Sequence, residues 1–85
     1  MFTEWYQLFV SPKTVGADVA QLVKRADGLL QQASAAVVAP GGSPHVHPDD
    51  GTCEVRVFQQ STLGLVRNIL DEYGLKIERE VKNDA

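Results

Sequence analysis

"STLGLVRNILDEYGLKIEREVK", residues 61–82, contains the clearest change of hydrophobic periodicity in the chain. Ser61 is a good N-cap residue for a helix. The apolar residues that follow it recur at helical spacing and are Leu63, Val66, Ile69, Leu70 and Tyr73. The first part of this stretch therefore predicts an amphipathic helix.

Gly74 marks the end of that helix and the start of a strand. Glycine suits the left-handed C′ position, and Leu75 at C″ can contact Leu70 at C3, as in a Schellman motif. Beyond it the sequence alternates up to Lys82, with Ile77 and Val81 on the apolar side and charged residues between them. These charges predict a final strand that lies at a sheet edge.

A similar strand and helix are expected at the beginning of the chain. Residues 2–10 alternate, and period two places Phe2, Tyr6, Leu8 and Val10 on one side and Trp5, Gln7 and Phe9 on the other. Aromatic residues on both sides favour a central strand whose second face is at least partly covered. A helix then begins with Ser11 or Thr14 as N-cap and runs to about Gln32. Its apolar stripe consists of Val15, Val19, Leu22, Val23, Ala26, Leu29, Leu30 and Ala33.

The middle of the chain predicts a hairpin with a long connection. Residues 35–39, "AAVVA", indicate a short strand that stops at Pro40. Residues 52–59 alternate between Cys53, Val55 and Val57 on one side and Glu54, Arg56 and Phe58 on the other.

These elements follow one another in the order βαββαβ within 85 residues. Two right-handed crossovers and a hairpin can join them into a four-stranded antiparallel sheet with both helices on one face. We therefore predict an α+β chain with the ferredoxin-like, or split βαβ, fold, and a single domain over residues 1–85.

The face of the sheet opposite the helices is the predicted binding surface. Its candidate binding residues are Trp5, Gln7, Phe9, Arg56 and Phe58, and Glu54 lies among them. Tryptophan and arginine are residue types enriched at the centres of protein interfaces. The alternative is that Trp5 and Phe9 are covered by the chain itself, either by the loop over residues 40–52 or by the C-terminal tail.

"GGSPHVHPDDGTC", residues 41–53, gathers the two histidines and the only cysteine of the chain. His45 and His47 could begin a metal site, but no second ligand cluster accompanies them, so a solvated turn segment without metal is expected. Cys53 is expected to be a small buried residue rather than a nucleophile. No catalytic residue and no cofactor is predicted.

Charge and composition exclude several classes of partner. The net charge is −3 and no basic patch is present, which argues against a nucleic-acid partner although aromatic residues on a sheet face also occur in RNA-recognition folds. No apolar run reaches the length of a membrane span, so no membrane association is expected. A lone cysteine favours a reducing compartment, and we expect a cytoplasmic protein.

The sequence thus favours a small non-catalytic protein-interaction module, either self-associating as a homodimer or docking on another protein through the open face of the sheet. One alternative is an acidic inhibitor or immunity-type protein that acts on a macromolecular partner. Another is a small dimeric enzyme or a ligand- or metal-binding protein that uses the loop over residues 41–53.

Overall fold

The computed structural model describes residues 4–84 and has the element order predicted from the sequence. Phe2, which the sequence assigns to the first strand, lies outside the described residues. The main elements are the strands β1 (Glu4–Pro12), β2 (Ala35–Val37), β3 (Cys53–Val57) and β4 (Leu75–Asp84), and the helices α1 (Val19–Gln32) and α2 (Leu63–Glu72). Two short 3-10 turns, η1 (Pro40–Gly42) and η2 (Gln60–Thr62), follow β2 and precede α2.

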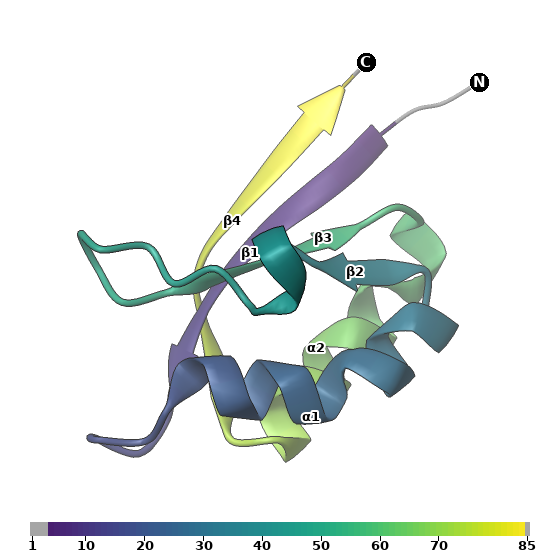
Figure 1. Cartoon of the computed structure of the whole chain (residues 1–85). Coiled ribbons are helices and arrows are strands. Elements are labelled where there is room, and N and C mark those ends of the chain that lie inside the picture. The colour runs from purple at the N-terminus through teal and green to yellow at the C-terminus, as the bar shows by residue number, and fades with distance from the viewer. Residues whose placement is uncertain (1–3, 85) are drawn as a thin grey trace.

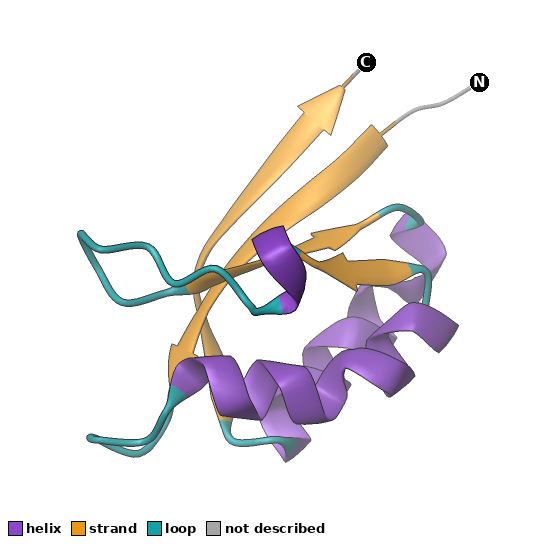
Figure 2. Cartoon of the chain, in the orientation of Figure 1, coloured by secondary structure: helices purple, strands orange, loops and turns teal. Residues whose placement is uncertain are grey.

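The four strands form one antiparallel sheet in the order β2-β3-β1-β4. Both helices lie on the same side of this sheet, and the long strands β1 and β4 run beside each other beyond the helical layer (Figure 1). The α+β fold with a ferredoxin-like arrangement is thereby confirmed, and the two helices and the single sheet form two layers (Figure 2). Among residues 4–84, neither helix is long and apolar enough to cross a membrane.

One hydrophobic core fills the space between the sheet and the helices. The central strands β1 and β3 contribute Tyr6, Leu8, Val10, Cys53, Val55 and Val57. The helices contribute Val19, Val23, Ala26, Leu30, Leu63, Val66, Ile69 and Leu70. The side chains of β1 and β3 alternate as the sequence predicts, and this alternation defines a helix-facing side and an open side of the sheet.

Helix α1 begins later than the sequence predicts. Its N-cap is Asp18, whose carboxylate accepts hydrogen bonds from the backbone N–H groups of Ala20 and Gln21 at 3.0 and 3.4 Å. Ser11 instead belongs to β1, and Val15 lies in the connecting turn with a fully exposed side chain. The expected cap at Ser11 or Thr14 is therefore wrong, because Asp18 satisfies the free N–H groups one turn further along.

Helix α2 is preceded by η2, so Ser61 lies inside a 3-10 turn and is not the helix cap. The hydroxyl of Thr62 donates a hydrogen bond of 3.1 Å to the carbonyl of Gln59, which stabilises this tighter turn. The predicted end of the helix is confirmed. Gly74 has a φ of +77°, its N–H donates to the Asp71 carbonyl at 3.1 Å, and Leu75 is buried in the core with Leu70.

Strand β4 contains a β-bulge that the sequence pattern does not reveal. Phe9 pairs with Arg79 and Val10 pairs with Ile77, so Glu78 has no partner in β1. Its carboxylate accepts a hydrogen bond from the Ser11 hydroxyl. The bulge moves the residues after it to the other face, so the prediction that Val81 shares the helix-facing side with Ile77 is wrong.

Candidate functional site

The open face of the sheet, opposite the helices, brings together residues of three strands. Directly opposed residues in an antiparallel pair point to the same face. Gln7 in β1 lies between Arg56 in β3 and Val81 in β4, and Phe9 lies between Glu54 and Arg79. The structure thus places the predicted residues Gln7, Phe9 and Arg56 on one surface.

Three residues of β4 belong to this surface although the sequence did not assign them to it. They are Arg79, Val81 and Asn83. A period-two interpretation of residues 76–82 puts Arg79 on the same side as Ile77, and only the bulge at Glu78 separates the two. Their position depends on how β4 pairs with Trp5, Gln7 and Phe9, which the sequence alone does not reveal.

A chain of hydrogen bonds between side chains crosses the open face from β4 to β3. Asn83 Nδ2 donates to Gln7 Oε1 at 3.1 Å, and Gln7 Nε2 donates to Glu54 Oε2 at 2.8 Å. Arg56 Nε donates to the same Glu54 oxygen at 2.8 Å. These hydrogen bonds orient the side-chain amides of Asn83 and Gln7, so the surface is ordered before any other protein binds.

Glu54 is the centre of this network. Its side chain is only 8% exposed, and this burial alone would raise its pKa. The hydrogen bonds from Arg56 and Gln7, together with the charge of Arg56, outweigh the burial and hold the pKa of Glu54 below its ordinary value. The open face therefore has an ionised carboxylate at its centre that is already neutralised by its neighbours.

Two arginines lie over aromatic rings on the open face. The guanidinium of Arg56 lies 5.3 Å from the centroid of the Trp5 ring, and that of Arg79 lies 4.2 Å from the centroid of the Phe9 ring. Such stacking fixes the guanidinium plane. Arg56 uses its Nε–H for Glu54, and its terminal N–H groups can face a partner. Trp5 itself is half-buried.

Phe9 is not an exposed anchor. Its side chain is 7% exposed, because Arg79 covers one part of the ring and the His47 ring lies 5.6 Å away in a tilted arrangement. The alternative in which the chain's own loop covers part of the sheet therefore holds for Phe9. Phe9 therefore offers little of its ring to a partner, because β4 and the loop bury the ring within the chain.

The loop that supplies His47 is folded onto the sheet. Val46 forms a bridge with Cys53, His45 N–H donates to the Val38 carbonyl at 3.0 Å, and His47 N–H donates to the Thr52 carbonyl at 2.8 Å. The Asp50 carboxylate accepts from both the hydroxyl and the N–H of Thr52, and these bonds lower the pKa of Asp50. The prediction of a merely solvated segment is therefore wrong for His47 and Thr52.

Cys53 and the two histidines are on different faces. Cys53 is fully buried among the core residues, and this burial, followed by the charge of Asp18, raises the pKa of its thiol. Because Val46 opposes Cys53, the neighbouring His45 and His47 project to the opposite, open side. Across residues 4–84, no group of three or more His, Cys, Asp and Glu side chains is placed to hold a metal ion.

Phe58 lies just beyond β3, where its N–H donates to the Ser34 carbonyl at 3.0 Å. Its side chain is 51% exposed, and strand alternation places it on the same side as Arg56. The exposed part of the candidate surface thus consists of Trp5, Arg56, Phe58 and Arg79, around the hydrogen-bonded centre at Glu54.

Comparison of the chain with protein-family models and with curated proteins finds no match. The geometry of the open face is therefore the basis on which its function is inferred.

Proposed function

We propose that this chain is a non-catalytic protein-interaction module that docks on another protein through the open face of its sheet. The observation that carries the proposal is the ordered arrangement of Trp5, Arg56 and Arg79, whose positions are set by ring stacking and by hydrogen bonds to Glu54. A surface that is ordered before binding loses less conformational entropy on association. Tryptophan and arginine are also the residue types that contribute most at interface centres.

Charge complementarity supports an acidic partner surface. The carboxylate of Glu54 is buried, whereas the side chains of Arg56 and Arg79 are accessible, so the open face presents positive charge on a chain of net charge −3. Two-fold stacking of two such faces would bring like charges together, which disfavours self-association as a homodimer. The net charge of −3 argues against a nucleic-acid partner, and the lone, buried Cys53 supports a cytoplasmic protein.

The test compares two exposed apolar residues on different surfaces. Phe58 and Leu65 are 51% and 53% exposed, and Leu65 lies on α2, away from the open face. Wild type, Phe58→Glu and Leu65→Glu are each immobilised and exposed to an extract of the organism that makes the protein. We expect a protein to be captured by wild type and by Leu65→Glu and to be lost with Phe58→Glu.

Trp5, the only tryptophan of the chain, then reports on the surface directly. The captured protein, once purified and titrated into this chain, should shift the Trp5 emission and should bind less tightly as salt is added. Equal capture by all three variants would place the interface elsewhere. If wild type sediments as a dimer and Phe58→Glu sediments as a monomer, the partner is a second copy of this chain and not another protein.

A further inference from the structure

Within residues 4–84, the outer edge of β2 has backbone hydrogen-bonding groups without a partner. Val38 N–H donates to the Glu54 carbonyl at 3.0 Å, and Phe58 N–H donates to the Ser34 carbonyl at 3.0 Å. Residues of an antiparallel strand alternate between pointing their N–H and C=O groups toward the neighbour and away from it. Ala36 therefore points its backbone groups toward β3, whereas Ala35 and Val37 point theirs outward from the sheet.

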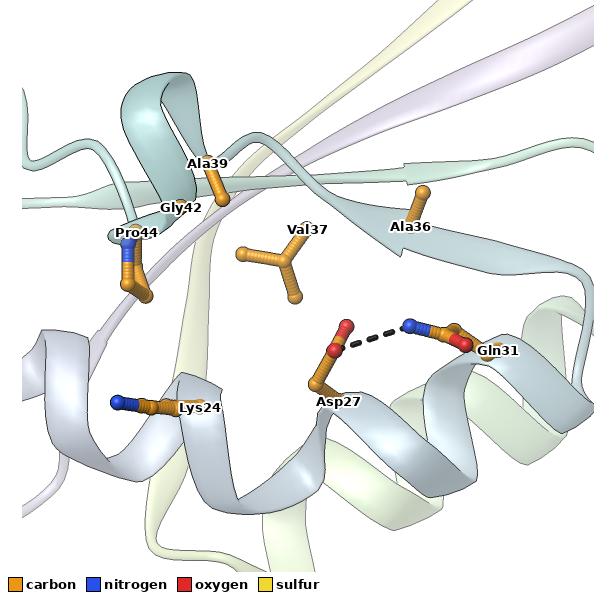
Figure 3. Close-up of a pocket in the computed structure, with 8 residues that line it drawn as sticks. All are labelled: Lys24, Asp27, Gln31, Ala36, Val37, Ala39, Gly42 and Pro44. Atoms are coloured by element: carbon orange, nitrogen blue, oxygen red, sulfur yellow. Dashed lines mark hydrogen bonds between the residues drawn. The ribbon is translucent and has the colours of Figure 1, made fainter.

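A groove lies along this edge, between β2 and α1 (Figure 3). Its volume is about 350 Å³, and a second hollow of about 210 Å³ continues it past Lys24 and Pro44. Figure 3 shows Val37 pointing toward α1 and Ala36 pointing away from it. A strand added beside β2 would point every second side chain into this groove, on the same side as Val37.

The two edges of the sheet differ in their protection against strand addition. β4 carries charged residues along most of its length and is distorted by the bulge at Glu78, which are both features that oppose edge pairing. β2 is made of Ala35, Ala36 and Val37, so it is protected only by its shortness and has neither charged side chains nor a bulge. The edge of β2 is therefore the place where the sheet can be extended.

The charges at the groove indicate which peptide fits it. Within the described part of the chain, Lys24 forms no salt bridge, so its ammonium group is available to a ligand. Two carboxylates line the groove and its continuation, and both already accept hydrogen bonds, Asp27 from Gln31 Nε2 at 2.9 Å and Asp18 from the backbone N–H groups that it caps. Lys24 lines both hollows, so its ammonium group can pair with an acidic group of a ligand.

We propose that an extended peptide segment of a partner protein adds as a strand to the outer edge of β2, with an apolar side chain in the groove and an acidic group at Lys24. The backbone groups of Ala35 and Val37 supply the hydrogen bonds, and the groove and Lys24 select the side chains, as in other complexes formed by strand addition. This site is on a different surface from the open face and does not depend on the function proposed for it.

The test uses a phage-displayed library of random peptides selected on the wild-type protein. Selected peptides are then synthesised, and their affinity is measured for Val37→Pro, which removes the outward N–H without removing a bond to β3. Circular dichroism of Val37→Pro checks that the variant is still folded. We expect Val37→Pro to weaken binding by about tenfold or more, the effect of a hydrogen bond worth about 1.4 kcal/mol.

Lys24→Glu and Arg25→Glu form a matched pair, since both residues are exposed neighbours on α1 and only Lys24 lines the groove. Peptides with an acidic residue should bind about tenfold more weakly to Lys24→Glu and equally well to Arg25→Glu. Bound peptide should also slow amide exchange at Ala35 and Val37. Failure to select any peptide would overturn the proposal. So would peptides that bind Lys24→Glu as well as wild type and leave the amides of Ala35 and Val37 unprotected. Both outcomes can be observed even where Val37→Pro does not fold.

Discussion

Glu54 illustrates how a charged residue can be buried on the face of a sheet. Its carboxylate accepts hydrogen bonds from both Gln7 and Arg56, so the cost of removing it from water is offset by two donors, one of which is charged. The residues that align Glu54 come from β1 and β3, and Asn83 of β4 orients Gln7 in turn. The order of the open face therefore depends on contacts between strands that are distant in sequence.

The first prediction concerns the pH dependence that Glu54 causes. The pKa of Glu54 is lower in the folded chain than in the unfolded chain. Its stabilising contribution is therefore present above the unfolded value of about 4.3 and is lost as the pH falls through the folded value. Glu54→Gln should lower the free energy of unfolding by about 1–2 kcal/mol at pH 7, because charged hydrogen bonds are replaced by neutral ones. This difference should shrink below about pH 4.

Urea unfolding of both proteins between pH 3 and pH 7 measures this effect. Glu72→Gln, at an exposed position at the end of α2, provides the control and should leave the pH profile parallel to that of wild type. A constant difference between wild type and Glu54→Gln over the whole range would show that the charge of Glu54 is not what stabilises the folded state.

The second prediction separates the two histidines. His47 covers Phe9 and is half-buried, whereas His45 is exposed. His47→Ala should reduce the free energy of unfolding by about 1 kcal/mol, the effect of returning several tens of Å² of the Phe9 ring to water. His45→Ala should change it by less than about 0.5 kcal/mol. Equal effects in chemical denaturation would mean that the loop does not protect Phe9.

At the level of elements, the helices and strands were predictable where a local signal defines them. The period of α2, its end at Gly74 and the alternation in β3 are properties of neighbouring residues and were interpreted correctly. The start of α1 cannot be predicted in this way, because Ser11, Thr14 and Asp18 are all acceptable caps. The choice among them depends on where β1 ends. The bulge in β4 was also missed, because it arises from pairing with β1 and leaves no mark in the alternation.

The third prediction tests the cap of α1. Asp18→Ala removes the acceptor for the N–H groups of Ala20 and Gln21 and should destabilise the protein by about 1 kcal/mol. Ser61→Ala, at the residue that the sequence favoured as the cap of α2, should be within about 0.5 kcal/mol of wild type. Thermal unfolding followed by circular dichroism compares the two, and a larger loss at Ser61 would contradict the described helix starts.

The fourth prediction concerns the inward face of α2. Leu70 is fully buried, so Leu70→Ala should cost about 2–5 kcal/mol by lost burial and by the cavity that remains. Leu65→Ala changes the same residue type on the same helix at an exposed position and should cost less than about 1 kcal/mol. Similar melting temperatures for the two variants would mean that the helix packs on the sheet with a different face.

For the whole molecule, the strand order predicts a gradient of protection against amide exchange. β1 and β3 are flanked on both sides, so their amides should exchange most slowly. Along β2 and the residue after it the rates should alternate, with Val38 slow and the outward amides of Ala35 and Val37 fast. Exchange measured by nuclear magnetic resonance on the free protein checks this pattern, and uniform protection along β2 would show that its edge is already occupied.

The sequence alone determined which segments become helices and strands, and hence the ferredoxin-like order, because periodicity, caps and turns are local properties of the chain. It also placed Gln7, Arg56 and Glu54 on one face, since in each strand they alternate with apolar residues that must face the helices. Only the tertiary structure decided that Arg79, Val81 and Asn83 join them, that Phe9 is covered by His47 and Arg79, and that the groove beside β2 exists. Each of these features depends on register, on a bulge or on loop packing, which are set by contacts between segments far apart in the chain.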